Sequence, residues 1–586
     1  MTIVNNMTLK IGGEAGQGVE SSGAGFAKAL SRGGLHLIAN SDYMSRIRGG
    51  YNFYQIRVSG KPVYAFERNV HLLLAFNPQA VTEHKDELAE GAGIIYDEEY
   101  KIDTTVARRG VKLFRLPLVK WAYEFGKDRI MANTAAIGAT VGVTGYDFAR
   151  VQEVIEQNFR RKGREVVDTN LKLARTAYEM ARDKYAKDFE YKIRPIPESP
   201  TWMMFNGNQA ICLGAIAGGV QFMSGYPMTP ATSVIEYLTA KGNQFGVVTK
   251  QTEDEISAIL MAIGASHAGV RAMTATSGGG FSLMVEALGM AGMTETPLVV
   301  VEAQRSGPST GLPTRTEQAD LNFVIHASQG EFPRIVLAPG THEQFFEAGF
   351  RAFNLAEKYQ CPVIILTDLY FSTLLRTLPL TAIDFGRVTI ERGELLTKEE
   401  LDNLTEAYLR HKVTDSGISP RAIPGHPKAV FMTTSDEHSE DGHIIEDAPR
   451  RIQMMEKRMR KLELARDQVR PPEVYGVENA DITLIGWGST YGALREVVDR
   501  LNQNGTRANL FFFIDLWPMS EEKILPLLQA AKYTVCVEGN YTGQFAGLLR
   551  RETGFTVNKL ITRYDGRPFT VDYILEALRE EVRLHV

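Results

Sequence analysis

The sequence contains very little cysteine. Only three cysteines occur in 586 residues, Cys212, Cys361 and Cys536, and they lie far apart in the chain. So few thiols exclude a disulfide framework and are typical of a reducing compartment, which predicts a cytoplasmic protein. They also exclude a four-cysteine iron–sulfur cluster or a structural zinc site built from this chain alone.

The sequence also lacks long apolar runs and an excess of positive charge. No run of about 18 apolar residues appears, and the opening MTIVNNMTLKIGG lacks the layout of a signal peptide. The net charge of −5 argues against a nucleic-acid partner, which normally needs a basic surface. The 44% hydrophobic and 23% charged residues are ordinary for a globular protein, and the length predicts three or four domains.

Strand-like and helix-like segments alternate through most of the chain. Buried-strand candidates such as PLVVVEA and CPVIILTD are separated by helical patterns, which indicates α/β domains with parallel or mixed sheets. We expect three such domains, at residues 1–190, 203–385 and 471–586. A proline-rich linker (191–202) separates the first two, and a polar segment that ends in a helix (386–470) precedes the third.

A glycine-rich turn follows the first strand-like segment. In GGEAGQGV, Gly13, Gly16 and Gly18 would let the backbone approach a phosphate at the start of a helix; a tight turn that packs helix on strand is the alternative. Downstream, SRIRGG places Arg46 and Arg48 beside two glycines. Such arginines suit a polyphosphate such as that of coenzyme A, and surface arginines on a loop are the alternative.

The stretch GYPMTP (225–230) restricts the backbone on both sides of Thr229, because Pro227 and Pro230 flank it. A hydroxyl that is ordered in advance can donate to a carboxylate or keto oxygen without further loss of entropy. A threonine that caps the following helix explains the pattern equally well. Local chemistry does not decide between these interpretations.

Two acidic residues, Glu253 and Glu255, precede the apolar helix pattern in KQTEDEISAILMAIGASHAG. Carboxylates are favourable in the first turn of any helix, so a simple helix-start role is the first interpretation of each. A carboxylate that enters the core there could instead exchange a proton with a bound heterocycle.

A long polar loop, EAQRSGPSTGLPTRTEQADL (302–321), follows the buried strand PLVVVEA. Ligands bind at the carboxyl ends of strands in open parallel sheets, and long loops of such composition are often functional. Arg305 and Arg315 are available for a carboxylate and Thr314 for a keto oxygen.

The polar segment before the third domain contains two features to test. In SDEHSEDGHIIED, His438 and His443 stand among six carboxylates; a metal site is conceivable, but we interpret the segment as an exposed structural loop. In the helix that follows, Ile452, Met455, Met459 and Leu462 predict an apolar stripe, and the basic residues around it predict a solvated face.

Taken together, these stretches resemble the 2-oxoacid:ferredoxin oxidoreductases, specifically an α subunit with a γ domain fused at its N-terminus. GGEAGQGV and SRIRGG resemble the γ domain, whereas GYPMTP, AIGAS and QRSGPSTGLPTRTEQADL resemble the pyrimidine-binding domain. ISPRAIPG, DEHSEDGHIIED and VEGNYTGQFAGLLR resemble the segments that follow, including a transketolase C-terminal-like domain. The resemblance covers nearly the whole chain, with several long motifs in the same order.

The resemblance implies chemistry based on thiamine diphosphate. The cofactor attacks a 2-oxoacid, CO₂ leaves, electrons pass singly through iron–sulfur centres to ferredoxin, and coenzyme A takes the acyl group. By the position of AIGAS, Glu255 rather than Glu253 would face the aminopyrimidine. Thr229, Arg305 and Thr314 would bind the substrate, and Tyr226 and Pro227 would contact the cofactor. The N-terminal glycines and arginines are candidates for coenzyme A.

A partner is implied by what the chain lacks. It carries neither the G-D-G motif with a distant asparagine pair that holds Mg²⁺ and diphosphate in thiamine enzymes, nor clustered cysteines. The family therefore implies a β subunit that contributes the diphosphate and Mg²⁺ site and a [4Fe–4S] cluster, ferredoxin as electron acceptor, and an (αβ)₂ heterotetramer. We expect no metal site, nucleic-acid partner or membrane contact in this chain.

The resemblance also bears on the preferred substrate. The fused layout and STGLPTRTEQ look most like the enzymes for 2-oxoglutarate, with pyruvate or a broad range of 2-oxoacids as the alternative, and reductive carboxylation would use the same site. Two other classes remain. A nucleotide-dependent dehydrogenase would need an acidic ribose-binding residue nearer than Asp42. A non-catalytic scaffold would leave the gathering of a hydroxyl, an arginine and a carboxylate unexplained.

Overall fold

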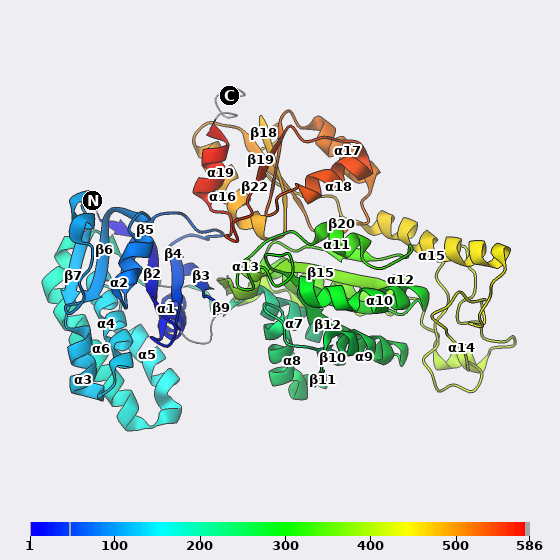
Figure 1. The fold of residues 1–586 in the computed structure, drawn as a ribbon, viewed down its shortest axis with the longest axis horizontal. Helices are drawn as coiled ribbons and strands as arrows, with labels where there is room; N and C mark the ends of the chain where they lie inside the picture. The colour runs from blue at the N-terminus through cyan, green and yellow to red at the C-terminus, as the bar shows by residue number, and fades with distance from the viewer. Residues whose placement is uncertain (1, 46–48, 198, 580–586) are drawn as a thin grey trace. The chain divides into compact units, whose positions relative to one another are not determined.

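The structure is a computed structural model that describes residues 2–45, 49–197 and 199–579. The chain forms two compact units. The N-terminal unit comprises Met1–Asn206 with the short returns Thr373–Ile383 and Thr570–Tyr573, and the C-terminal unit contains Gly207–Ser372, Asp384–Phe569 and the chain from Ile574. Figure 1 shows the first unit mainly in blue and cyan and the second in green to red.

The N-terminal unit is built on one eight-stranded mixed sheet, in the order β7-β6-β5-β2-β4-β3-β16-β9. Its strands are β2 (Asn6–Glu14), β3 (His36–Asp42), β4 (Tyr51–Ser59), β5 (Val70–Ala75), β6 (Leu88–Asp97), β7 (Lys112–Leu116), β9 (Trp202–Phe205) and β16 (Leu375–Pro379). Strand β2 pairs in parallel with β5 and antiparallel with β4. The strand after the first helix, β3, pairs with β4 rather than with β2, so the strand–helix–strand start spans one inserted strand.

Helices cover both faces of this sheet. The helices are α1 (Val19–Arg32), α2 (Pro78–His84), α3 (Leu118–Gly126), α4 (Ala132–Thr144), α5 (Phe148–Phe159) and α6 (Arg164–Tyr185). A large apolar core joins one face to α1 and α3–α6, and a smaller core lies under α2. Helices α5 and α6 are separate elements, because Gly163 between them has a φ of +102° that an α-helix does not tolerate.

The C-terminal unit contains a seven-stranded sheet in the order β11-β10-β12-β13-β15-β14-β20. Its strands are β10 (Phe222–Gly225), β11 (Val248–Gln251), β12 (Ala272–Thr276), β13 (Leu298–Gln304), β14 (Ile335–Leu337), β15 (Pro362–Asp368) and β20 (Asp515–Trp517). Every pairing is parallel except that of β14 with β20. Strands β13 and β15 are buried along their whole length, as expected when both faces of a parallel sheet are covered.

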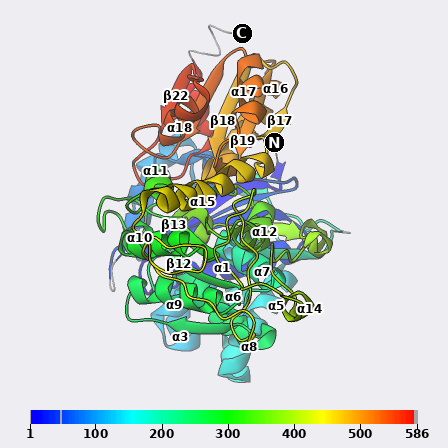
Figure 2. The same ribbon diagram turned by 90° about the vertical axis from the view of Figure 1, so that its right-hand side faces the viewer.

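The covering helices divide between the two faces of this sheet. They are α7 (Gly207–Ala217), α8 (Thr232–Phe245), α9 (Glu255–His267), α10 (Gly278–Met293), α11 (Leu321–His326), α12 (His342–Tyr359) and α13 (Leu369–Thr373). Figure 2 shows α7, α8 and α12 on one side of β12 and β13, and α9 and α10 on the other. Because β10, β12, β13 and β15 are parallel, their carboxyl ends lie at the same edge of the sheet. The predicted site residues lie in the loops at this edge.

A five-stranded sheet, in the order β17-β19-β18-β21-β22, completes the C-terminal unit. Its elements are β17 (Glu473–Gly476), β18 (Ile482–Trp487), α16 (Tyr491–Gln503), β19 (Ala508–Phe513), α17 (Glu521–Ala530), β21 (Thr534–Glu538), α18 (Gln544–Thr553), β22 (Lys559–Thr562) and α19 (Val571–Ala577). One apolar core runs through both sheets of this unit and includes Val300, Trp487 and Phe545. The prediction of an α/β fold with parallel and mixed sheets is confirmed. No helix within the described ranges is long and apolar enough to cross a membrane.

The polar segment between the two sheets contains α14 (Lys398–Asp402) and α15 (Ala448–Gln468), and it differs from the sequence-based expectations. Of the predicted apolar stripe of α15, Leu462 is buried and Met455 and Met459 are half-buried, but Ile452 is exposed. The buried face also includes the cations Lys457, Arg458 and Lys461, so these three are not part of the expected solvated face, whereas Arg450 and Arg451 are exposed. In the loop before it, His438 is fully buried, whereas His443 is exposed as expected.

Candidate active site

The candidate acid Glu255 is the first residue of α9, and the structure separates it clearly from Glu253. Asp254 caps the helix by accepting a hydrogen bond from Ser257 N at 2.7 Å. Glu253 is exposed and accepts a hydrogen bond from Ser257 Oγ at 2.9 Å. Glu255 turns into the core with 3% exposure, and its Oε1 has no hydrogen-bond partner among the described residues. A buried carboxylate oxygen without a partner is costly, which indicates a ligand site.

The first turn of α10 closes around Glu255. A side chain at Gly280 would bring its Cβ within 2.6 Å of Glu255 Oε1 and 2.1 Å of Thr276 Oγ1, so only glycine fits there. Met228, from the GYPMTP stretch, lies against the same turn: its sulfur accepts a hydrogen bond from Gly280 N at 3.2 Å. The proline-bounded stretch and the buried carboxylate are therefore neighbours through α10.

Thr229 and Arg305 are also brought together. Arg305 Nη1 donates to the backbone oxygen of Thr229 at 2.8 Å, which holds the guanidinium beside the half-buried threonine. Partial burial lowers the pKa of Arg305 from its ordinary value, and the group stays a cation because arginine titrates so far above neutral pH. Tyr226 and Pro227, just before, are exposed, and α8 begins at Thr232, with no side-chain cap from Thr229.

Thr314 returns to this point because its loop folds back on itself. Ser306 pairs with Leu312 in an isolated bridge, and Ser306 N donates to Arg315 O at 3.1 Å. Thr314 is 9% exposed, next to that closure. Glu255, Thr229, Arg305 and Thr314 thus follow the carboxyl ends of β11, β10 and β13, at one edge of the seven-stranded sheet.

The far end of the loop is bound to the five-stranded sheet through Gln318. Its backbone N donates to Gly539 O at 2.6 Å, its side chain donates to Trp487 O at 3.0 Å and accepts from Gly539 N at 2.8 Å, and its backbone O accepts from Asn540 at 3.0 Å. Gln544 also donates to Ala319 O at 2.6 Å. The motif VEGNYTGQ therefore holds the loop in place.

Polar atoms without partners are concentrated at the same edge. Ser277 Oγ at the start of α10 and Thr367 Oγ1 on β15 are buried without a hydrogen-bond partner among the described residues. Both oxygens of Glu302, near the end of β13, receive no hydrogen bond from an N–H or O–H donor there, and they face the carboxyl of Asp320. Burial, with Asp320 and Asp368 nearby, raises the pKa of Glu302 well above its usual range. Residues 274–280 and Glu302 were not among the predicted site residues. Three consecutive glycines after a buried strand were the available signal.

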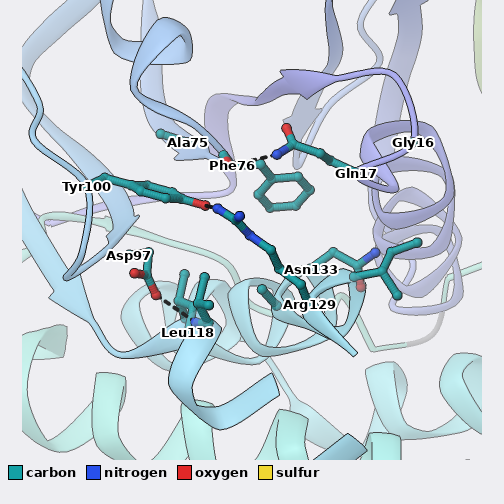
Figure 3. A pocket seen from close by; sticks show the side chains of 12 residues that line it. Gly16, Gln17, Ala75, Phe76, Asp97, Tyr100, Leu118, Arg129 and Asn133 are labelled. Atoms are coloured by element: carbon teal, nitrogen blue, oxygen red, sulfur yellow. Dashed lines mark hydrogen bonds between the residues drawn. The ribbon is translucent and has the colours of Figure 1, made fainter. Parts of the chain in front are cut away.

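The N-terminal glycine turn lines a pocket of its own. Gly16 and Gly18 have φ angles of +92° and +76°, which allow the sharp turn from β2 into α1, and no side chain caps α1. Gly16 and Gln17 line a cavity of about 190 Å³ together with Phe76, Tyr100, Arg129 and others (Figure 3).

The other candidates of this region lie around or beyond that pocket. Gly13 packs under it, where a Cβ would come within 2.6 Å of Gln17 Oε1. Arg129 reaches across it and donates to the Tyr100 hydroxyl at 3.3 Å, although sequence reasoning did not single it out. Arg46 and Arg48 lie outside the described residues.

A second buried ionic cluster surrounds Glu295, between α10 and β13. Its carboxylate binds Lys457 at 2.5 Å and also Lys461, while His411 Nδ1 lies 3.0 Å from it. Glu295, His411 and His438 hold potential metal-ligand atoms within 4.8 Å of one another. Because both carboxylate oxygens already bind ammonium groups, a dication would add positive charge to a cationic site. We interpret this cluster as an ionic core rather than a metal centre.

Comparisons with known proteins cover both units. Residues 213–457 match the family described as pyruvate flavodoxin/ferredoxin oxidoreductase, thiamine diphosphate-binding, and residues 8–180 match pyruvate ferredoxin/flavodoxin oxidoreductase. The chain is 35% identical to the 2-oxoacid:ferredoxin oxidoreductase subunit alpha of Sulfolobus sp, with 98% of this chain and 96% of that one covered. It is 28% identical to the 2-oxoglutarate oxidoreductase subunit KorA of Mycobacterium tuberculosis, over 98% of this chain and 91% of that one.

A solved structure is similar along the whole chain. It is the 2-oxoglutarate:ferredoxin oxidoreductase from Magnetococcus marinus with 2-oxoglutarate, coenzyme A and succinyl-CoA bound. The TM-score is 0.92 at 34% identity, with 99% of this chain and 100% of that chain covered. Together with the buried carboxylate, the paired arginine and threonine and the two family matches, this likeness shows that the chain belongs to the thiamine-diphosphate-dependent 2-oxoacid:ferredoxin oxidoreductases, as an α subunit.

Proposed function

We propose that this chain is the α subunit of a 2-oxoglutarate:ferredoxin oxidoreductase. The reaction would convert 2-oxoglutarate, coenzyme A and oxidised ferredoxin to succinyl-CoA, CO₂ and reduced ferredoxin, with reductive carboxylation as the reverse. The observation that carries this proposal is Glu255, a buried carboxylate with a free oxygen at the first turn of α9. We assign the γ-type role to residues 1–190, the pyrimidine-binding role to 203–385 and the transketolase C-terminal-like role to 471–586.

The residues present fit the aminopyrimidine of thiamine diphosphate. Glu255 Oε1 is buried and has no hydrogen-bond partner among the described residues. A ring nitrogen of the cofactor that shares a proton with this oxygen would be such a partner. The absence of a side chain at Gly280 leaves the approach to that oxygen open. When bound, the cofactor supplies the carbon nucleophile that attacks the keto carbon of a 2-oxoacid. Mg²⁺ and the diphosphate would be held by the β subunit, which also carries the [4Fe–4S] cluster.

Each of the chain's own site residues would then have a separate role in binding the substrate or moving a proton. Glu255 holds or accepts the proton at the ring nitrogen, in a place from which water is excluded. Arg305 binds the substrate carboxylate by a charge-assisted hydrogen bond. Thr229 donates its hydroxyl to the keto oxygen, in a position fixed by the Arg305 contact with its backbone. Thr314, at the loop closure beside Arg305, adds a second hydroxyl.

An exposed apolar face beside the site supports the requirement for a partner. Ile256, Leu260 and Met261 on α9 are 45%, 40% and 40% exposed, and Leu283 on the adjacent α10 is 50% exposed. Contiguous apolar surface of this kind is typical of an interface. Because α9 begins with Glu255, a β subunit that covers this face would also cover the cofactor, and two such pairs would form the heterotetramer.

The N-terminal pocket supports a contact with coenzyme A. The uncapped start of α1 and the Arg129 guanidinium offer positive charge to a phosphate, and Phe76 and Leu118 offer apolar surface. The cavity has room for one part of the molecule. Isothermal titration of coenzyme A into the assembled complex tests this contact: we expect Arg129→Gln to weaken binding about tenfold, as for the loss of one charged hydrogen bond. Unchanged affinity in Arg129→Gln would contradict it.

The decisive experiment is co-expression with the β subunit and measurement of viologen dye reduction that depends on coenzyme A and thiamine. The substrates are 2-oxoglutarate, pyruvate and other 2-oxoacids, and the isolated chain serves as one control. We expect activity only in the complex and highest with 2-oxoglutarate. A preference for another oxoacid would keep the mechanism and discard the substrate. A folded, cofactor-loaded complex that reduces no dye would favour the scaffold alternative.

A further inference from the structure

The substrate loop, residues 305–320, begins and ends at the same point of the sheet. Gln304, the last residue of β13, accepts a hydrogen bond from Asp320 N at 3.0 Å and donates to Thr367 O at 3.1 Å. Glu302 lies two residues before Gln304, so both side chains leave the same face of β13. The Glu302 carboxyl therefore faces Asp320, at the base of the loop.

Asp320 also contacts the start of α10. A side chain at Gly278 would bring its Cβ within 2.5 Å of Asp320 Oδ2, so the carboxylate lies against the first helical residue. The N-terminus of α10 carries partial positive charge, and Ser277 at its cap position makes no capping hydrogen bond. One negative charge on Asp320 is favourable there. A second negative charge on the buried Glu302 would have no such compensation.

The charged groups that face this pair are themselves carboxyls. Asp368 on β15 acts on Glu302, and Glu317 in the loop acts on Asp320. Asp368 accepts hydrogen bonds from Phe371 N and other donors. Its carboxylate is therefore stabilised without a hydrogen bond from Glu302. Glu317 hydrogen-bonds Ser306 within the loop. Two buried carboxyls in contact cannot both ionise without a large cost, so they share one proton.

We propose that Glu302 is a positioning residue: it remains a protonated acid, donates a hydrogen bond to the Asp320 carboxylate, and so fixes the substrate loop against the first turn of α10. This hydrogen bond between Glu302 and Asp320, which we call the latch, joins the loop that carries Arg305 and Thr314 to the helix turn that contacts Met228 and Glu255. Its role in catalysis depends on the proposed function of this site. Its existence depends only on the geometry of the chain.

The pKa directions agree with this arrangement. Burial and the facing carboxyls raise the pKa of Glu302 well above its usual range, and burial with the Glu317 charge raises the pKa of Asp320 to about 6. A carboxyl whose pKa is raised in the folded state binds its proton more tightly there than in the unfolded chain. Its contribution is therefore complete at low pH and is lost as pH rises through the folded-state pKa.

The first test is infrared spectroscopy of the isolated chain near neutral pH. We expect the carbonyl-stretch band of a buried carboxylic acid, and we expect it to be absent in Glu302→Gln. Glu286→Gln is the matched control, because Glu286 is an exposed carboxylate on α10 whose removal should leave the band intact. No buried-acid band in the wild-type chain, or a band that survives in Glu302→Gln, overturns the proposal.

The second test is hydrogen exchange across residues 305–320 as pH is raised from about 6 until the infrared band of the Glu302 acid is lost, corrected for the intrinsic exchange rate. In the wild-type chain we expect protection to fall about tenfold as Glu302 ionises, which is the loss of one charged hydrogen bond. Glu302→Gln keeps a neutral donor and should stay protected throughout. Equal pH dependence in both chains overturns the latch. The wild-type measurement stands by itself if a variant fails to fold.

A third measurement, in the assembled complex, separates the latch from the enzyme proposal. We expect Glu302→Ala to raise the KM for the oxoacid about tenfold with a smaller change in kcat, and Glu302→Gln to restore the KM. An unchanged KM in Glu302→Ala contradicts the positioning role. If the complex has no oxoacid-dependent activity, the proposed function fails, while the infrared and exchange results still decide whether the acid pair exists.

Discussion

Two clusters of buried ionisable side chains lie within the same unit, and they are satisfied very differently. Around Glu295, each carboxylate oxygen binds an ammonium group, and Arg410 donates to the backbone oxygen at 2.8 Å. At the carboxyl edge of the seven-stranded sheet, Glu255 Oε1 has no hydrogen-bond partner among the described residues, and the oxygens of Glu302 face another carboxyl, that of Asp320. Unsatisfied polar atoms are costly and persist where a ligand or a proton completes them.

The comparison therefore separates a cluster that stabilises the fold from one that is arranged for chemistry. Removing a member of the first should cost stability, because it leaves a buried charge unpaired. Removing Glu255 from the second should cost activity with little loss of stability, because its Oε1 makes no hydrogen bond with the described residues.

The largest expected effect concerns Glu255. We expect Glu255→Gln to lower kcat of the assembled complex by about 10²–10⁴-fold, the usual contribution of a general acid or base. The free energy of unfolding of the isolated chain should not fall, because Glu255 Oε1 makes no hydrogen bond among the described residues. Steady-state kinetics and chemical denaturation measure the two effects.

Glu253→Gln is the matched control, since Glu253 is exposed two residues earlier and precedes the same helix. It should leave both kcat and stability nearly unchanged. A Glu255→Gln complex that keeps full activity would remove Glu255 from the mechanism and weaken the comparison itself.

Glu295 should give the opposite result. We expect Glu295→Ala to lower the free energy of unfolding by about 3–5 kcal/mol, the usual cost of breaking a buried ion pair, because it leaves Lys457 and Lys461 buried without their counter-charge. Denaturant unfolding measures this change. The triple variant Glu295→Leu, Lys457→Met and Lys461→Met should recover much of the loss, because an apolar replacement leaves no charge unpaired.

Loss of activity without loss of stability in Glu295→Ala would show that this cluster serves the reaction as well. That outcome would end the distinction between the two clusters.

Arg305 tests the substrate side of the edge. We expect Arg305→Lys to lower kcat/KM for 2-oxoacids about 10–100-fold, because lysine keeps the charge but loses the planar fork that binds both a carboxylate and the Thr229 carbonyl. The change should appear mainly in KM. Arg315→Lys is a control on the same loop, and an equal effect there would indicate that charge near the loop, rather than the Arg305 geometry, binds the substrate.

Sequence patterns predicted the framework of the site because the relevant signals are local. A buried strand with a polar loop at its carboxyl end indicated a ligand-binding loop around Arg305, and the family resemblance placed Thr229 and Arg305 together at the substrate. A hydrogen bond joins these two residues in the structure. Glu255 could be preferred over Glu253 only by resemblance, because both precede the same helix. The structure separates them by which side chain turns inward.

The buried charges could not be predicted in the same way. Lys457 and Lys461 looked like a solvated helix face, because nothing nearby in sequence reveals that Glu295, more than 160 residues earlier, neutralises them. The burial of Glu302 was missed for a different reason. It follows a run of apolar strand residues, so it was interpreted as the start of the polar loop. In both cases a contact between residues far apart in the sequence decides whether the side chain is buried. Local hydrophobic periodicity carries no information about such contacts.

The smallest expected effect is the pH dependence of the free energy of unfolding. It compares directly how many protons the folded and unfolded states bind. Burial lowers the pKa of His411 to about 3, whereas histidine in the unfolded chain takes up its proton near 6.5. The unfolded state therefore binds more protons between these values, and stability should fall as pH decreases below about 6.5, by at most about 1.4 kcal/mol per pH unit from this residue. Glu295 acts in the same direction, because Lys457 and Lys461 outweigh its burial and hold its pKa well below the usual range.

Denaturant unfolding across about pH 4–7 measures this slope, and paired histidine variants assign it. His411→Gln should flatten the acid limb, because the glutamine has no proton to gain on unfolding. His443→Gln should leave the slope as it is, since His443 is exposed in the same polar segment. An acid limb that is equally steep in both variants would mean that His411 is not held neutral by the fold. The ionic core would then depend on its carboxylate and lysines alone.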